Sequence, residues 1–231
     1  SKDISSPLSS HIEELRNYLL LPFIINTILM IVIISFASSL VIDILETVNL
    51  DIKDLSSYSP VEFFKTKIFL SLVLSLISSS PLWLISIYNF SRIGLTDFER
   101  NNIRYTFIIG QTFFLAGCGV GFFLIAPYFL DLLLNDSEMV IQNLSIYETI
   151  KIIISATLFT GLLVSTPVFT LLINRLVEGR KEVRKYIYTL ILFIAIIATP
   201  KPSMILNIIF LLSFISIAEI TMLLAGVKGE N

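Results

Sequence analysis

The chain has 231 residues, of which 55% are apolar and 15% are charged, and its net charge is −2. Its mean hydropathy of +0.87 exceeds what a water-soluble domain of this length usually carries. The composition therefore argues against an ordinary soluble protein. It predicts an integral membrane protein, for which we expect no nucleic-acid partner.

Six long stretches without a charged residue follow one another along the chain. The first lies between Arg16 and Asp43 and has 26 residues, which is long enough to cross a bilayer. The other five have 24, 26, 23, 15 and 17 residues and lie at 68–91, 105–130, 152–174, 186–200 and 202–218. Backbone groups in lipid must be satisfied within the segment or in a closed barrel, and the stretches lack the alternation of a barrel. They predict helices.

We therefore expect an all-α membrane protein with six transmembrane helices in a curved or cupped bundle, forming one integral membrane domain over residues 1–231. The approximate spans are 17–42, 68–90, 105–130, 149–174, 186–200 and 204–225. The fifth apolar run would reach only about 22 Å as a helix, against a hydrocarbon core of about 30 Å. Helices five and six should therefore form a short hairpin, which favours local thinning of the membrane.

The distribution of Lys and Arg predicts the orientation. With a cytoplasmic amino terminus and six crossings, 11 of these residues lie on the cytoplasmic side and five lie outside. This asymmetry agrees with the positive-inside rule. The first run is too long for the apolar region of a cleavable signal peptide, so we expect it to remain as a span. The prediction is a multi-pass protein of the cytoplasmic membrane with both termini inside.

The sequence also predicts where helices start and where they bend. Four segments fit the capping box, in which Ser or Thr caps the helix and an acid three residues later bonds back: Ser10–Glu13, Ser59–Glu62, Thr96–Glu99 and Ser145–Glu148. Pro60 stands at the first helical position, which proline favours. Prolines within or at the end of the first five spans predict bent helices: Pro22, Pro81, Pro127, Pro167 and Pro200.

The third span contains a GxxxG spacing from Gly117 to Gly121, which lets another helix approach closely. Cys118 is the single cysteine, so an intrachain disulfide and a cysteine-based metal site are excluded, and we assign it to packing. The single histidine, His11, could act as a catalytic base only beside a nucleophile, and the sequence contains no GxSxG nucleophile motif. The HExxH, P-loop and GxGxxG motifs are also missing. We expect no enzyme activity, no cofactor and no metal site.

Acidic residues gather near the predicted cytoplasmic helix starts, at Glu13, Glu14, Asp97 and Glu99. Carboxylates are the natural partners of guanidinium groups. A structural role competes with binding at Glu13 and Glu99, because both occupy capping-box positions and acids suit helix N-termini. Glu14 has no such evident structural role, so on physical grounds alone a binding role and a structural one are evenly matched there.

Glu219 follows an apolar run, where an acid is costly and usually faces a partner or water. Snorkelling of its carboxylate to the membrane interface is the competing explanation. A secondary transporter or ion channel that uses Glu219 is therefore an alternative function, and a purely structural membrane scaffold is a third.

The hexapeptide His11-Ile12-Glu13-Glu14-Leu15-Arg16 resembles the HxxELR signature of the TatC family, the multi-spanning receptor subunit of the twin-arginine protein translocase. Other stretches resemble family landmarks in the same order: Ser59-Pro60 with Phe63-Phe64, Ser80-Pro81, Phe98-Glu99-Arg100, Ala126-Pro127, Thr166-Pro167-Val168, Ala198-Thr199-Pro200 and Ala218-Glu219-Ile220. The resemblance implies six helices in a cupped shape, the last two short, with both termini in the cytoplasm.

The resemblance also implies a non-enzymatic receptor. It would bind twin-arginine signal peptides of folded proteins at the cytoplasmic face and recruit single-span TatA/TatB-type subunits, driven by the protonmotive force. Glu14 and Glu99 match the acids that recognise the paired arginines, with Arg16 and Arg100 as supporting neighbours. The lipid bilayer is a further partner, and association into a homo-oligomer is compatible with this role.

Some positions match less well. Ser165 stands where the family often has an acid, and Ile93 where it often has a proline. Asn207 lies one position out of register with a polar residue of the family. The candidates for intramembrane polar or partner contacts are Glu219, Thr199, Asn207 and Ser165, and those for structural roles in the first outer loop are Pro60 and Phe63.

Overall fold

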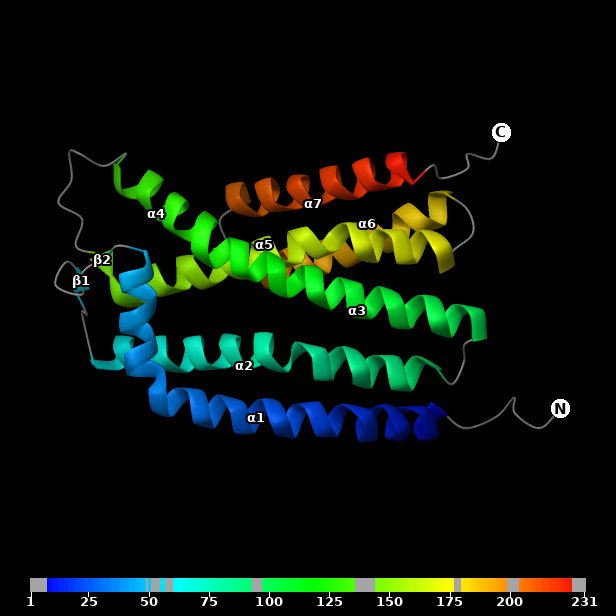
Figure 1. The fold of residues 1–231 in the computed structure, drawn as a ribbon, viewed down its shortest axis with the longest axis horizontal. Coiled ribbons are helices and arrows are strands. Elements are labelled where there is room, and N and C mark those ends of the chain that lie inside the picture. Colours follow the sequence, from blue (N-terminus) through cyan, green and yellow to red (C-terminus); the bar gives the residue numbers. More distant parts are fainter. Residues whose placement is uncertain are drawn as a thin grey trace.

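The computed structural model describes residues 8–48, 50, 55–56, 60–92, 97–135, 144–176, 180–198 and 204–225. In chain order its elements are α1 (Leu8–Thr47), β1 (Leu55–Ser56), α2 (Pro60–Ser91), α3 (Asp97–Val120), the π-helix η3 (Gly121–Ile125), α4 (Ala126–Asn135), β2 (Leu144–Ser145), α5 (Ile146–Leu176), α6 (Arg180–Ala198) and α7 (Met204–Leu224) (Figure 1). Because α3, η3 and α4 are continuous, the helices form six rods. The predicted all-α class is confirmed.

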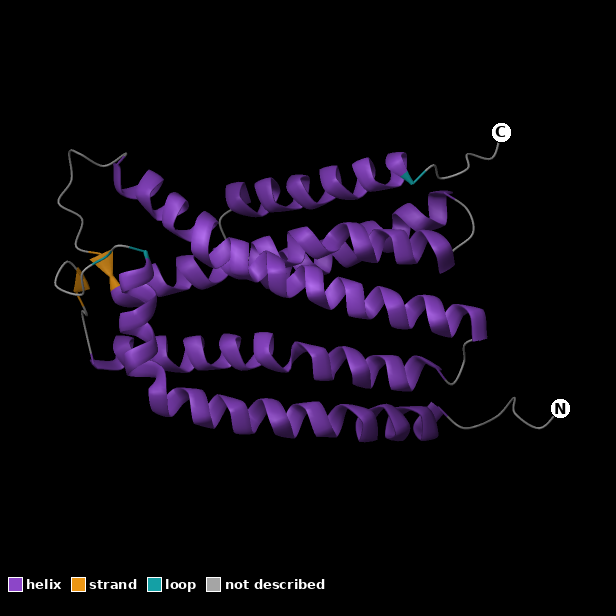
Figure 2. Cartoon of the chain, viewed as in Figure 1, coloured by secondary structure: helices purple, strands orange, loops and turns teal. Residues whose placement is uncertain are grey.

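The helices dominate the described structure, as Figure 2 shows. Among the described residues, four helical stretches are long and apolar enough to cross a membrane: Glu13–Thr47, Val61–Ser91, Arg100–Asp131 and Ile146–Arg175. With 19 and 21 residues, α6 and α7 are the shortest rods, and a shorter apolar stretch of α7 covers Leu211–Leu224. The start of α7 lies well short of the end of the molecule where β1 and β2 lie (Figure 1). The predicted short final hairpin is confirmed.

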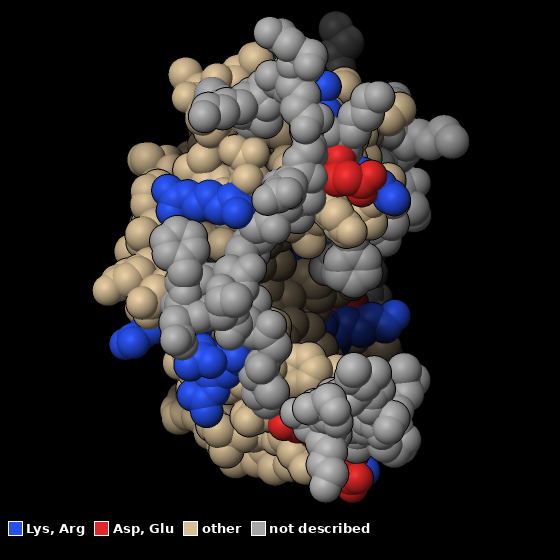
Figure 3. All heavy atoms as spheres, turned by 90° about the vertical axis from the view of Figure 1, so that its right-hand side faces the viewer, with Lys and Arg blue, Asp and Glu red and all other residues tan. Residues whose placement is uncertain are grey.

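Successive rods run antiparallel, so their ends collect at two ends of the molecule (Figure 1). One end, which we call the termini end, holds the start of α1 and the end of α7, together with the end of α2, the start of α3, the end of α5 and the start of α6. The opposite end holds β1 and β2, and we call it the strand end. The face at the termini end is hollowed near its centre (Figure 3), in keeping with the predicted cupped shape.

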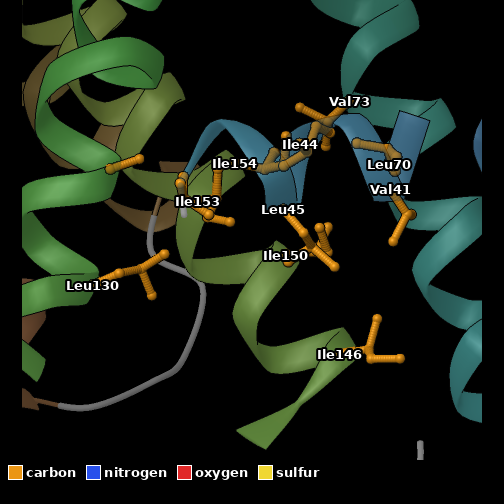
Figure 4. Close-up of a cluster of buried hydrophobic side chains, with 12 residues drawn as sticks. Val41, Ile44, Leu45, Leu70, Val73, Leu130, Ile146, Ile150, Ile153 and Ile154 are labelled. Carbon is orange, nitrogen blue, oxygen red and sulfur yellow. The ribbon is translucent and has the colours of Figure 1, made fainter. Parts of the chain in front are cut away.

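A first apolar core lies toward the strand end and joins four helices (Figure 4). Leu45 of α1, Leu70 of α2 and Ile150 of α5 are fully buried in it, and Leu130 of α4 closes one side. To reach this cluster, the last part of α1 turns and crosses α2 (Figure 1). The sharp bend of α1 therefore lies well beyond Pro22, where the sequence had suggested one, and it brings Leu45 into the core.

A second apolar core joins the last three helices. It contains Val183 and Ile187 of α6 with Phe214 and Ala218 of α7, and Phe159 of α5 packs against it. The rings of Phe159 and Phe214 meet edge to face, with centroids 5.3 Å apart. Since α5 contributes to both cores, it is the central helix of the bundle, and the short hairpin is anchored to it.

Glycines bring α3 and the adjoining η3 into close contact with α5. A Cβ atom added to Gly117 would lie 2.9 Å from the Cα atom of Gly161, and one added to Gly121 would lie 2.9 Å from the Cα atom of Thr157. The space beside Gly161 is occupied by Cys118, which is buried. Without side chains at these points the two backbones approach closely, as small residues allow in membranes. The predicted packing roles of the GxxxG spacing and of Cys118 are confirmed.

Prolines are accommodated in different ways. In α2 the ring of Pro81 leaves the carbonyl of Ile77 without its helical donor, and the Ser80 hydroxyl donates to that carbonyl at 2.7 Å. Gln111 of α3 in turn donates to Ser80 Oγ at 2.7 Å. In the third rod the π-helix η3 ends with the Ala126 N–H donating to Gly121, directly before Pro127. Pro167 lies inside α5, and Pro200 lies outside the described residues.

The strand end carries a feature that the sequence did not predict. Leu55–Ser56 and Leu144–Ser145 pair as two short parallel strands, so the connections on either side of the bundle are joined. Beside them the Ser145 hydroxyl donates to the Glu62 carboxylate at the start of α2 and accepts the Glu148 N–H at 3.3 Å. The predicted cap at Ser145 is therefore present, and it also links α5 to α2.

The other predicted helix starts differ in outcome. Helices α2 and α3 begin at Pro60 and Asp97, directly after the predicted caps Ser59 and Thr96, which lie outside the described residues. The first helix begins at Leu8, so Ser10 lies within its first turn and the predicted start at Ser10 is wrong by two residues. Glu13 is consequently not at the third helical position.

Candidate functional site

At the termini end the starts of α1 and α3 lie on either side of the end of α2. Tyr18 of α1 meets Phe90 of α2 edge to face, with ring centroids 6.4 Å apart. Arg100 of α3 donates from Nη2 to the carbonyl of Arg92 at 3.2 Å, just beyond α2. These two contacts place the beginnings of α1 and α3 at the same end of the molecule, where the sequence concentrates its acids.

The two acids of the hexapeptide have different surroundings. Glu13 accepts from Arg16 Nη2 at 3.2 Å, three residues along the same helix, and both side chains are 67% exposed. Glu14 is partly buried, and among the described residues it makes no hydrogen bond or ion pair. The predicted capping role of Glu13 is therefore wrong, because Glu13 forms an ion pair with Arg16. Arg16 thus pairs with Glu13 and not with Glu14.

Glu99 belongs to the first turn of α3, beside Asp97. The backbone of this turn is described, whereas the side chains of both acids lie outside the described residues. Arg100, the predicted supporting neighbour, is partly buried and holds the connection from α2 as described above. Glu14, in the second turn of α1, and Glu99, in the first turn of α3, therefore lie near the starts of two helices that meet the same surface. Basic side chains lie on both sides of the hollow in this surface (Figure 3).

Glu219 lies in α7, where its carboxylate faces α6. Its Oε2 atom is 2.6 Å from Arg184 Nη2, and its Oε1 atom accepts from the Tyr188 hydroxyl. The side chains of Arg184 and Glu219 are 39% and 24% exposed. The hydrogen bond to Glu219 is the main cause that raises the pKa of Arg184. Glu219 is therefore one half of an ion pair between helices.

This pairing corrects the premise of the transporter alternative, which treated Glu219 as a lone acid in the membrane. The adjacent guanidinium of Arg184 neutralises the charge of the Glu219 carboxylate, and the Tyr188 hydroxyl donates a further hydrogen bond to it. These contacts join α6 to α7 near the termini end. Arg184 and Tyr188 are residues that the sequence reasoning missed. Their spacing of four residues, which places both on one face of a helix, was the available signal.

The remaining predicted residues have separate positions. Ser165 is buried in α5 and donates to the carbonyl of Leu162 at 2.9 Å, so its hydroxyl is satisfied within its own helix. Thr199 and the side chain of Asn207 lie outside the described residues. Phe63 packs against the first core, with Lys67 Nζ 4.8 Å from its ring centre, and Pro60 is the first residue of α2.

Comparisons with known proteins agree on one family. A family model described as Sec-independent protein translocase protein (TatC) matches residues 10–212. The Sec-independent protein translocase protein TatC of Methanocella arvoryzae is 25% identical over 227 residues, which cover 96% of this chain and 94% of that protein. The protein TatCy of Bacillus subtilis is 24% identical over 224 residues, covering 94% of this chain and 88% of its own.

The fold has a counterpart of known structure. A crystal structure of the twin arginine translocase receptor TatC matches with a TM-score of 0.68, covering 92% of this chain and 99% of that one. The sequences are 21% identical, so this likeness concerns the fold alone. The family model, by contrast, spans most of the sequence, including the hexapeptide from His11 onward and the acids of α3. This chain is a multi-pass membrane protein that belongs to the TatC family of Sec-independent protein translocase components.

Proposed function

We propose that this translocase subunit is the receptor for twin-arginine signal peptides, which it binds at the termini end through Glu14 and Glu99. The observation that carries the proposal is the carboxylate of Glu14, which has no ion-pair partner among the described residues although Arg16 is close by in sequence. A planar guanidinium binds a carboxylate through two parallel hydrogen bonds. Two carboxylates on two helices suit two adjacent arginines.

In this proposal the two acids act together. Glu14 supplies one carboxylate from α1 and Glu99 supplies the other from the first turn of α3, which meets the same surface as the start of α1. Arg16 keeps Glu13 occupied, and Arg100 fixes the connection from α2, so both act as supporting neighbours. The peptide would arrive from the cytoplasm, with both termini of this chain on that side of the cytoplasmic membrane.

Membership of the family supports a proposal for the further steps. The bound receptor would recruit single-span TatA/TatB-type subunits and nucleate a complex that moves folded proteins with the protonmotive force. Glu219, already paired with Arg184, would serve the structure of the short hairpin rather than contact the peptide. Thr199 and Asn207 would face these partner subunits, whereas Ser165, which is buried in α5, would serve packing within the bundle.

Binding of a labelled twin-arginine signal peptide to the purified full chain tests the site. We expect Glu14→Gln and Glu99→Gln each to weaken binding by about tenfold, since a charge-assisted hydrogen bond contributes roughly 1.5 kcal/mol. Glu13→Gln is the matched control, because its carboxylate is held by Arg16, and a twin-lysine peptide is the control ligand. Undiminished binding to the double variant would refute the assignment.

A further inference from the structure

A cavity of about 430 Å³ lies between α2 and α3 in the half of the bundle near the termini end. Its volume falls within the range of about 300 to 1,000 Å³ typical of small-molecule sites. Most of its wall is apolar and is formed by Pro81, Leu84, Ile85, Phe107 and Ile108. Ile85 and Ile108 are 54% and 56% exposed, so the cavity opens on the outer surface of the bundle, where lipid chains would lie.

The polar groups of the cavity are arranged along its length. Tyr88, Asn89 and Arg104 line the part closest to the ends of α2 and α3. Among the described residues of the wall, Arg104 alone carries a charge, and it is exposed. At the deeper end Gln111 donates to Ser80, which donates to Ile77, so the polar groups there are already occupied by one another.

We propose that this cavity binds an anionic phospholipid, with the phosphate at Arg104 and one acyl chain between α2 and α3. From Arg104 to Thr112 the wall extends for about 12 Å at about 1.5 Å per residue, a depth that suits an acyl chain entering from the surface. Asn89 and the Tyr88 hydroxyl are the further groups able to bond the headgroup.

The positive charge of Arg104 favours a ligand that is apolar with an anionic group over one that is apolar with a cationic group. A signal peptide of the twin-arginine class carries positive charge at its front, which Arg104 would repel, whereas a phosphodiester is attracted to it. Basic pockets between transmembrane helices on the cytoplasmic side are a recurrent means of binding anionic headgroups. The inference rests on the placement of the chain in a membrane and not on the proposed peptide site.

Native mass spectrometry of the full chain in mild detergent tests the proposal, with phosphatidylglycerol and phosphatidylcholine of identical acyl chains as probes. We expect preferential retention of phosphatidylglycerol, reduced about fivefold in Arg104→Gln, the effect of one basic side chain near an anionic headgroup. Ile108→Trp, which fills the cavity, should reduce retention of both lipids. Lys185→Gln, an exposed cation at the same end on α6, should change neither.

Three results would overturn the proposal. The first is equal retention of phosphatidylglycerol by Arg104→Gln and the unchanged chain, and the second is equal retention of the two lipids by the unchanged chain. The third is a loss of twin-arginine peptide binding in Ile108→Trp with lipid retention intact, which would assign the cavity to the peptide. Because Glu14→Gln leaves the cavity untouched, failure of the lipid site and failure of the peptide site are separate outcomes.

Discussion

Arg184 of α6 and Glu219 of α7 form an ion pair across the short hairpin, with 2.6 Å between Nη2 and Oε2. We expect Glu219→Gln and Arg184→Gln each to lower the melting temperature in detergent by a few degrees, because each removes the opposite charge beside a partly buried charge. The double variant should lose less than the sum of the two, as expected for residues in contact. Glu182→Gln, an exposed acid on the same helix, is the control.

The same variants separate the proposed peptide site from the hairpin. If Glu219→Gln abolished peptide binding at a temperature where the chain remains folded, the assignment of Glu219 to structure would be wrong. We expect peptide affinity to be unchanged, since Glu219 is already satisfied by Arg184 and Tyr188.

Two glycines of α3 provide a matched pair for the contact with α5. We expect Gly117→Ala to cost about 1–3 kcal/mol, since its methyl group would lie 2.9 Å from the backbone of Gly161 and neither helix has room to yield. Gly119→Ala should leave stability unchanged or slightly raise it, because no atom lies within 4 Å of the added carbon and alanine favours helix. Thermal unfolding of both variants in one detergent distinguishes the positions. Equal losses would show that helix packing is not what requires Gly117.

The cap at Ser145 has a double role at the strand end. We expect Ser145→Ala to cost about 1 kcal/mol through the lost cap and also to remove the hydrogen bond from Ser145 to Glu62 of α2. Faster amide hydrogen exchange in the first turn of α5 would report the change. Ser35→Ala, which removes an exposed hydroxyl bonded only to the carbonyl of Ile31, should leave that exchange unaffected.

Orientation in the membrane is open to a direct measurement. Cys118 is only 6% exposed, so single cysteines can be added without removing it. We expect a membrane-impermeant maleimide to label Lys65→Cys, near the strand end, in intact cells, and to label Lys185→Cys, at the termini end, only after permeabilisation. Both lysines are exposed, so accessibility within the fold is matched. The reverse pattern would contradict the cytoplasmic placement of the termini.

The sequence predicted what depends on local pattern. The charge-free runs predicted the helices, and Ser145 predicted the start of α5. Both predictions succeeded because hydropathy and capping are properties of neighbouring residues. The start of α1 was misplaced at Ser10 for a related reason. Several residues near a helix end can serve as caps, and the helix extends to Leu8.

Features that depend on distant segments were not predicted. The partner of Glu219 lies 35 residues earlier, and only the packing of α6 on α7 brings Arg184 to it. The spacing of Gly117 and Gly121 predicted a close contact with another helix but not which helix. The structure shows that the partner is α5, whose Gly161 and Thr157 lie opposite the two glycines. Glu99 was proposed through family resemblance, and its side chain lies outside the described residues.

The parallel pairing of Leu55–Ser56 with Leu144–Ser145 restricts how the bundle can deform. Backbone hydrogen bonds there tie the connection between α1 and α2 to the one between α4 and α5, and the link from Ser145 to Glu62 reinforces them. Helices pinned together at one end move apart most at the other. Any widening of this molecule would therefore pivot about the strand end and be greatest where Glu14 and the first turn of α3 lie.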